Sequence, residues 1–194
     1  MSDQYNHNGI CANINPSDYG DLKRTCYDLF YNMCFNKIEY DMNRYCIKCL
    51  WNFCEKYNDQ ILNEIENGND NVMTFYGYVN HQHNNLDNTD KYLLMAIEKE
   101  NVHALYFLGR KYLDDDNIQL AKKYLHRAID KKCAHAMCEL GDYYFDHDIE
   151  QSLKYHLMAS DNGHARSMYT VGYHYQYEEP NYDLMKKYYL MAIE

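Results

Sequence analysis

The chain has 194 residues, enough for one domain of ordinary size, and its 46% hydrophobic and 25% charged residues are close to globular averages. Its 29 acidic residues outnumber 19 basic ones, and the net charge of -10 repels phosphate backbones and anionic lipids. These totals exclude a large multidomain enzyme and argue against a nucleic-acid partner. Two prolines and eight glycines leave little material for the turns of an all-β fold, so the composition favours helices.

The N-terminus carries no basic segment followed by an apolar run, and no window approaches 18 consecutive apolar residues. We therefore expect an intracellular, cytoplasmic protein that makes no contact with a membrane. The eight cysteines are then expected to be reduced thiols, with metal binding as the alternative.

The first 66 residues show no clear repeat. Residues 1–20 are polar and aperiodic, and we interpret them as a flexible lead-in. Helical spacing follows Pro16, and a second run from about residue 39 to 67 has an apolar side chain at every fourth position, at Tyr45, Cys49, Phe53, Tyr57, Ile61 and Ile65. We interpret residues 21–66 as a helical cap on the repeats that follow. The alternative is a small separate recruitment module.

This N-terminal segment also holds the clearest metal candidate in the sequence. Cys46 and Cys49 have the spacing of half a zinc site, and Cys26, Cys34 and Cys54 lie nearby. However, the surrounding residues read as continuous helix without the tight turn that such pairs use, and cysteine is a common buried apolar residue. We therefore expect no metal or other cofactor. A zinc-binding regulatory module in this segment remains the alternative.

Two columns of residues recur downstream at a period of 31 to 33 residues. One contains Gly77, Gly109, Gly141 and Gly172, and the other contains Tyr92, Tyr124, Tyr155 and Tyr188, each followed four residues later by alanine. A fixed period of this length is the signature of a repeat architecture. We place four repeats at about residues 67–100, 101–132, 133–163 and 164–194.

The sequence pattern predicts two helices in each repeat. Ala104, Leu108 and Tyr112 share one helical face, and Gly109 leaves room for a partner helix to approach closely. The connectors at residues 114–117, 146–148 and 178–181 are short and polar, which predicts antiparallel hairpins. Because a single hairpin cannot bury its own apolar faces, the hairpins must stack. The expected fold is therefore an all-α solenoid.

The second repeat carries the pattern Ala-x3-Leu-Gly-x2-Tyr followed by Ala-x2-Tyr-x3-Ala, at Ala104, Leu108, Gly109, Tyr112, Ala121, Tyr124 and Ala128. This pattern resembles the Sel1-like repeat, a relative of the tetratricopeptide repeat. The first repeat departs most from it, with Val72 for the leading alanine and Asn80 for the tyrosine. The richness in Asn, Tyr and Ile is similar to that of repeat proteins of giant amoeba-infecting viruses, which would place the chain in a host cytoplasm.

Catalytic motifs are missing from the sequence. It contains no Gly-x-Ser-x-Gly elbow, no phosphate-binding glycine-rich loop and no His-Glu-x2-His. His156 and the other histidines of the repeat helices are interpreted as packing or surface residues, and Cys138 as apolar filler within a helix. We expect no enzymatic activity.

In related repeat families the inner face of the solenoid binds peptides or partner helices, and the resemblance implies the same use here. The positions three before and one after each glycine point away from the packing face, which places Thr74 and Cys138 beside the candidate residues. Aromatic residues and arginine are enriched in protein interfaces. The predicted partner-binding residues of this adaptor or scaffold are Phe75, Tyr78, Tyr106, Arg110, Glu139, Asp142, Tyr169 and Tyr173.

The sequence ends with the second helix of the fourth repeat, at Glu194. No following helix covers the apolar residues of this edge, which are Tyr188, Leu190, Met191 and Ile193. We expect a second copy of the chain or another partner to cover them, unless the chain is cut from a longer array.

Overall fold

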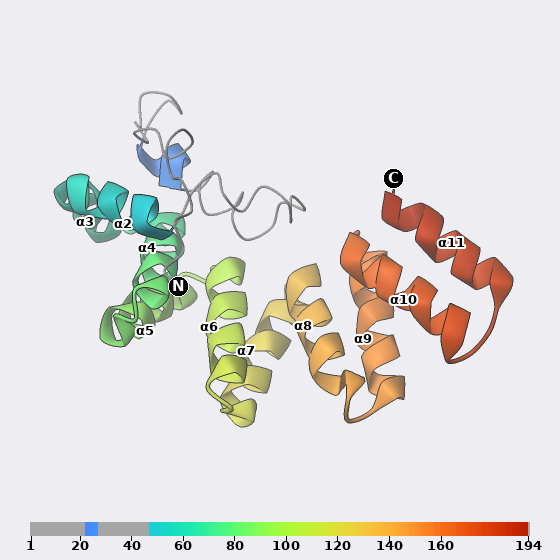
Figure 1. The fold of residues 1–194 in the computed structure, drawn as a ribbon. Helices are drawn as coiled ribbons and strands as arrows, with labels where there is room; N and C mark the ends of the chain where they lie inside the picture. The colour runs from blue at the N-terminus through green and yellow to red at the C-terminus, as the bar shows by residue number, and fades with distance from the viewer. Residues whose placement is uncertain (1–21, 27–46, 194) are drawn as a thin grey trace, which may run out of the picture. The chain divides into compact units, whose positions relative to one another are not determined.

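The computed structural model describes residues 22–26 and 47–193, and every regular element within these ranges is a helix (Figure 1). The predicted all-α fold is confirmed. The lead-in expected at residues 1–20 lies outside the described residues. Across the described ranges, no helix combines the length and the apolar character that crossing a membrane requires.

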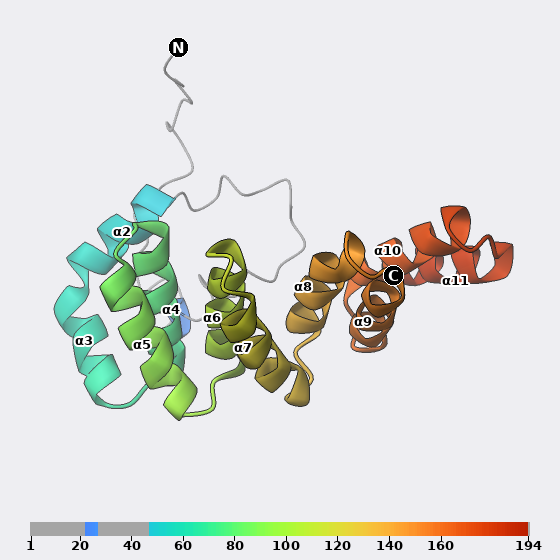
Figure 2. The ribbon, with the colours of Figure 1, turned by 90° about the horizontal axis from the view of Figure 1, so that it is seen from below.

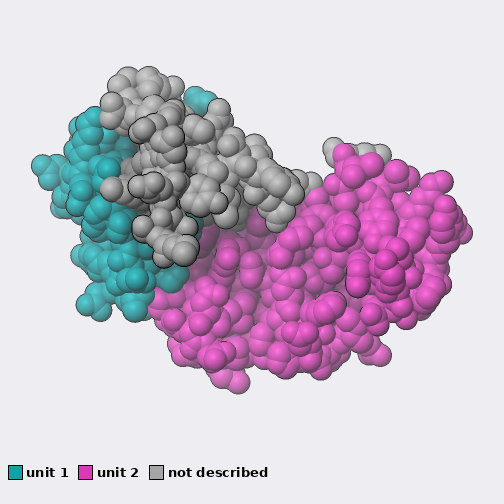
Figure 3. All heavy atoms as spheres, viewed as in Figure 1, with its two compact units in different colours: residues 1–101 teal, residues 102–194 magenta. Residues whose placement is uncertain are grey.

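The chain divides into two compact units, residues 1–101 and residues 102–194, which Figure 3 colours separately. In the first unit, α2 (Ile47–Lys56) and α3 (Asn58–Glu66) precede a hairpin of α4 (Asp70–Gln82) and α5 (Leu86–Glu98). The second unit contains three hairpins, formed by α6 (Val102–Asp114) with α7 (Ile118–Asp130), α8 (Ala134–Phe145) with α9 (Ile149–Asp161), and α10 (Ala165–Tyr177) with α11 (Tyr182–Ile193).

In the first unit, α2 and α3 both pack against α4 (Figure 2). The continuous helix expected up to residue 67 is interrupted at Tyr57, whose φ of -111° and ψ of 21° are not helical. Phe53 and Ile61 are buried as the fourfold spacing predicted, and the Phe53 ring lies 6.1 Å from the ring of Phe75 on α4. The two helices therefore cover one side of the first hairpin.

The cysteines of the N-terminal segment are only partly described. Cys26 and Cys54 are buried, and burial raises the pKa of the Cys54 thiol to about 12. Cys34, Cys46 and the side chain of Cys49 lie outside the described residues. The alternative of a zinc module in this segment therefore remains an expectation from the sequence.

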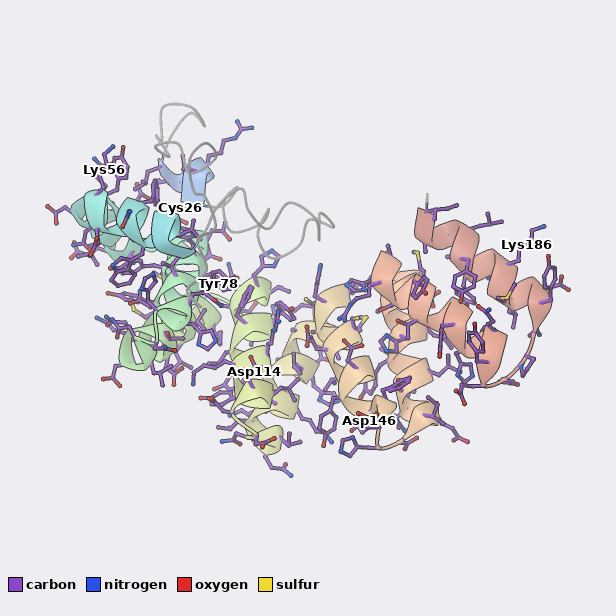
Figure 4. All side chains as sticks on the ribbon, viewed as in Figure 1. Cys26, Lys56, Tyr78, Asp114, Asp146 and Lys186 are labelled. Atoms are coloured by element: carbon purple, nitrogen blue, oxygen red, sulfur yellow. The ribbon has the colours of Figure 1, made fainter. Side chains whose placement is uncertain are left out.

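In the second unit the three hairpins stack in chain order: α8 packs on both α6 and α7, and α10 packs on α9. The turns connect helix ends closely, as at Asp146, which ends α8 just before α9 begins (Figure 4). The second helices begin with a side-chain cap in each of these hairpins, because Asn117, Asp148 and Asn181 accept hydrogen bonds from backbone N–H groups three residues later.

The glycine column sets the spacing of the two helices within each hairpin. A Cβ atom on Gly109 would lie 2.7 Å from Cγ of Leu125 and 3.1 Å from its backbone nitrogen. Gly77 faces Leu93 in the same way, and Gly172 faces Tyr189. The predicted close approach at the glycine is thus confirmed, and it depends on the missing side chain.

In three of the four hairpins, the tyrosine three residues after the glycine stacks on the tyrosine of the second helix. Tyr112 stacks on Tyr124, with ring centroids 5.7 Å apart and an interplanar angle of 17°. The third and fourth hairpins contain the same stack. In the first hairpin Asn80 replaces the tyrosine, and its amide donates to the Tyr76 carbonyl oxygen. The recurring sequence columns are therefore contacts between the two helices of one hairpin.

The turns that lead into the four hairpins share one backbone feature. Gly68, Glu100, Lys132 and Gly163 all have positive φ values, between 62° and 82°. Their spacing of 31 or 32 residues repeats the period of the glycine column. Two of the four positions carry a side chain in a conformation that favours glycine.

Candidate partner-binding face and polar cluster

The column three residues before each glycine is mostly buried, which corrects the expectation that it lines an open inner wall. Thr74, Tyr106 and Cys138 are at most 3% exposed, whereas Tyr169 is 58% exposed. The reason is visible within the second unit, where the hydroxyl of Tyr106 on α6 donates to Glu139 on α8 at 3.1 Å. Within the second unit, Tyr106 and Cys138 of this column face the neighbouring hairpin, and periodicity within one helix cannot show such a contact.

Phe75 is also a core residue. Its side chain is fully buried in the first unit, where the ring of Phe53 from α2 packs against it edge-on. A partner therefore has no access to Phe75, and the expectation that it belongs to the binding face is not met. Tyr78, on the same helix, is half-buried.

The column one residue after the glycine is more accessible in the second unit. Arg110 is exposed, and Asp142 and Tyr173 are both 41% exposed. On α10, Tyr169, Tyr173 and Tyr177 recur at every fourth position and are 58%, 41% and 59% exposed. We call these three residues the tyrosine strip. The rings of Tyr173 and Tyr177 lie 4.7 Å apart, and the ring of Tyr169 lies 5.4 Å from that of Tyr189 on α11.

A shallow pocket adjoins the tyrosine strip. It is open to solvent and lies between α8, α9 and α10. Phe145, Ile149, Val171 and Tyr173 supply much of its apolar lining, and the first two are 48% and 40% exposed. It is therefore a shallow apolar depression beside the tyrosine strip and not an enclosed site for a drug-sized ligand.

Glu139 is an acidic group in a largely buried position between the first two hairpins of the second unit. Burial raises the pKa of its carboxyl, whereas the nearby Arg110 guanidinium opposes that rise. Burial, followed by the charge of Glu139, raises the pKa of the Tyr106 hydroxyl. Because these groups satisfy one another, they join α6 to α8, and their main contribution is to packing.

A second polar cluster contains Cys138 and Asp142 of α8 and His156 of α9. Their candidate ligand atoms lie within 4.8 Å of one another. The Cys138 thiol lies 4.0 Å from Nδ1 of His156, and Nε2 of His156 lies 3.5 Å from a carboxylate oxygen of Asp142. Both Cys138 and His156 are 1% exposed.

Arg166 of α10 reaches this cluster from the next hairpin. Its Nη2 atom lies 2.6 Å from Oδ2 of Asp142 and 3.1 Å from the sulfur of Cys138. Ser167 of α10 also contacts the cluster. Its hydroxyl lies 3.2 Å from Nδ1 of His156 and 3.0 Å from Nδ1 of His164. Three consecutive helices thus contribute to one polar site.

The sequence interpretation missed this cluster, because it took His156 for a packing residue and Cys138 for filler. A signal was present in the repeat alignment. His156 faces Gly141, as Leu93 faces Gly77 and Leu125 faces Gly109. A histidine in place of leucine in a buried column is the kind of local exception that marks a special site.

The cluster has the residue types of a cysteine–histidine–aspartate triad but not its chemistry. Burial raises the pKa of the Cys138 thiol to about 12, and the charge of Asp142 adds to that effect. A nucleophilic cysteine needs a lowered pKa and access for its substrate. With a buried, protonated thiol, this arrangement does not favour thiol catalysis.

The fold described above is similar to that of a solved Sel1 repeat protein from Oxalobacter formigenes. The two structures align with a TM-score of 0.55 and 19% sequence identity. The alignment covers 79% of this chain and 64% of the other, so this chain spans about two thirds of that protein's length. At this identity the likeness establishes the fold, an α-helical Sel1-type repeat array.

Comparisons by sequence found no match. No protein-family model matches the chain, and no curated protein is significantly similar to it. The resemblance to Sel1-like repeats therefore stands on the repeat pattern and on the likeness of the folds.

Proposed function

We propose that this protein is a non-enzymatic scaffold or adaptor that binds a protein partner on the inner face of its helical repeats. The observation that carries this proposal is the tyrosine strip of α10. Three exposed aromatic side chains on one rigid helix offer a large contact area at a low entropic cost, and tyrosine is enriched among the residues that dominate binding energy.

The pocket beside the strip supports the same proposal. Tyr173 belongs to both, so a bound segment that lies along α10 can place one apolar side chain against Phe145 and Ile149. Arg110 and Asp142 are also accessible on α6 and α8, although Arg110 lies close to Glu139 and Asp142 pairs with Arg166. Such an arrangement of an apolar pocket with aromatic and charged neighbours is typical of peptide recognition.

The proposal also includes the absence of enzymatic activity, the location in the cell and the oligomeric state. A non-enzymatic role agrees with the raised pKa of the Cys138 thiol. The location in a host cytoplasm and the viral origin rest on sequence alone and stay predictions. A homodimer through α11 is supported by the exposure of Leu190 and Ile193, at 46% and 80%, whereas Tyr188, expected to be uncovered at this edge, is buried and stacks on Tyr175. Light scattering across micromolar concentrations tests it, and a strictly monomeric profile would contradict it.

The adaptor proposal is tested by affinity capture from the cells that naturally contain the protein. We compare the wild type with a Tyr169→Ala, Tyr173→Ala double variant and identify the bound proteins by mass spectrometry. Because each truncation of a central aromatic residue costs at least about 1–2 kcal/mol of binding, the double variant should retain less than about a tenth of the partner.

The matched control is Tyr182→Ala, which removes a tyrosine that is 72% exposed on α11. It should retain the partner as the wild type does. Each variant is first checked for unchanged helicity by circular dichroism. Equal recovery of a partner by the double variant and the wild type would remove the tyrosine strip from the binding site.

A further inference from the structure

We propose that Cys138, Asp142 and His156 form a binding site for a divalent transition metal of the zinc type. In this site the guanidinium of Arg166 holds the place of the cation while no metal is bound. The site lies within the second unit and does not depend on the proposed binding of a partner. It is also distinct from the cysteines of the N-terminal segment.

The hydrogen bonds around Ser167 determine which nitrogen of His156 carries a proton. His164 caps α10, because its Nδ1 accepts from the backbone N–H of Ser167. The same Nδ1 lies 3.0 Å from the Ser167 hydroxyl. Because this nitrogen is an acceptor, the hydroxyl donates a hydrogen bond to His164. The Ser167 oxygen can then only accept from Nδ1 of His156, at 3.2 Å. His156 is therefore protonated on Nδ1.

This assignment leaves Nε2 of His156 with a lone pair. That atom is buried, makes no hydrogen bond and lies 3.5 Å from a carboxylate oxygen of Asp142. A buried nitrogen acceptor without a donor then faces a carboxylate oxygen of the partly exposed Asp142, an arrangement that a cation between them would stabilise.

The ligand set suits zinc. Cys138 and Asp142 are four residues apart and share one face of α8, and His156 approaches from α9. Thiolate, imidazole and carboxylate are the usual zinc ligands, with bonds of about 2.0–2.3 Å. Ligand atoms at these bond lengths around a tetrahedral ion lie about 3.3–3.8 Å apart, so side chains whose ligand atoms now lie within 4.8 Å of one another would have to close in slightly on binding. The Nδ1 contact with Ser167 supplies the outer hydrogen bond that orients a metal-binding histidine.

Arg166 explains how the cluster is stabilised without a metal. Its guanidinium contacts the Cys138 sulfur and the Asp142 carboxylate, the two anionic ligands that a metal would use. The side chain of Arg166 is 53% exposed and can turn into solvent. When a metal binds, the Cys138 thiol releases its proton to water, the thiolate and the carboxylate balance the two positive charges, and no electron is transferred. A water molecule can take the fourth position, because Asp142 is 41% exposed.

Cobalt(II) is the probe for this site, because a thiolate bound to tetrahedral cobalt gives a distinct charge-transfer absorption. The reduced, metal-free full chain is titrated with Co²⁺, and Zn²⁺ is then added to displace it. We expect about one Co²⁺ per chain with the thiolate band, and loss of that band on addition of Zn²⁺.

The chain offers matched variants. His156→Leu restores the residue type that occupies this place in two other hairpins, so it should fold, and it should weaken Co²⁺ binding by about 100-fold or more. Cys138→Ala should abolish the thiolate band at this site. Cys133→Ala removes another buried cysteine outside the cluster and should leave the titration unchanged. Arg166→Ala removes the competing cation and should tighten binding several-fold.

Three results would overturn the proposal. The first is a wild-type chain without a thiolate–cobalt band. The second is binding that persists in both His156→Leu and Cys138→Ala but is lost in a Cys46→Ala, Cys49→Ala variant, which would place the metal in the N-terminal segment. The third is an Arg166→Ala variant that binds Co²⁺ no more tightly than the wild type, since Arg166 would then not compete for the site.

Discussion

At the scale of single residues, four glycines allow the two helices of each hairpin to approach closely. A methyl group at Gly109 would meet both the side chain and the backbone of Leu125. Overpacking of this kind costs about 1–3 kcal/mol, and the better helix propensity of alanine offsets about 1 kcal/mol of it. We expect Gly109→Ala to lower the free energy of unfolding by up to about 2 kcal/mol in urea denaturation. Lys123→Ala, on the exposed surface of α7, should change it by less than about 0.5 kcal/mol.

A substitution at Lys132 is expected to stabilise the chain, in contrast to Gly109→Ala. Its φ is 63°, and Gly68 and Gly163 occupy the corresponding turns of other hairpins. A left-handed conformation costs a residue with a side chain about 1–2 kcal/mol, and glycine loses part of this advantage through its freedom in the unfolded chain. Lys132→Gly should therefore raise the free energy of unfolding by about 0.5–1 kcal/mol.

The control for this substitution is Lys99→Gly. Lys99 also ends a helix, but its φ of -93° is one that any residue adopts. Glycine there should lower stability. If both substitutions destabilise the chain equally in thermal unfolding, the left-handed turn is not a source of strain.

At the scale of the helices, the three hairpins of the second unit are joined by polar side chains at the start of their first helices. His135 of α8 lies between Tyr106 of α6 and His164 of α10, with ring centroids 5.8 Å and 4.9 Å away. Burial, followed by the charges of His103 and Arg166, lowers the pKa of His135 from 6.5 to about 4. The packing of adjacent hairpins therefore favours the neutral ring.

This shift predicts a dependence of stability on pH. Between about pH 6.5 and 4 the unfolded chain binds a proton at His135 that the folded chain does not. The free energy of unfolding should therefore fall as the pH is lowered through this window. His135→Asn, which copies Asn71 at the corresponding position of the first hairpin, should make the fall shallower. Denaturation curves at several pH values test this, and identical slopes for the two chains would contradict it.

The packing of the helices also explains which parts of the site could be predicted from the sequence. The glycine and tyrosine columns describe contacts inside one hairpin, and the periodicity of the two helices is enough to place Gly109 against its partner helix. Tyr106 and Phe75 are different, because other helices cover them: α8 reaches Tyr106, and α2 reaches Phe75. Contacts between hairpins depend on how the units stack, which a single repeat does not encode.

At the scale of the whole molecule, the period of the repeats was enough to predict an all-α array of hairpins, because each repeat contributes the same supersecondary unit. The polar cluster could not be predicted in this way, since Cys138, His156 and Arg166 come from three different helices. Only the substitution of histidine for leucine in a repeating column points to it from sequence. The accessible surface of α10 then becomes the main candidate for binding.

The most direct test of the scaffold proposal is photo-crosslinking in the natural cells, with a photoreactive amino acid in place of Tyr173 in one chain and in place of Tyr182 in another. Tyr173 lines the pocket beside the tyrosine strip, whereas Tyr182 is exposed on α11. We predict a specific protein adduct at position 173 that is missing at position 182 and disappears when Tyr169→Ala is added. Adducts of equal yield at both positions, or none at position 173, would contradict a partner-binding face on α10.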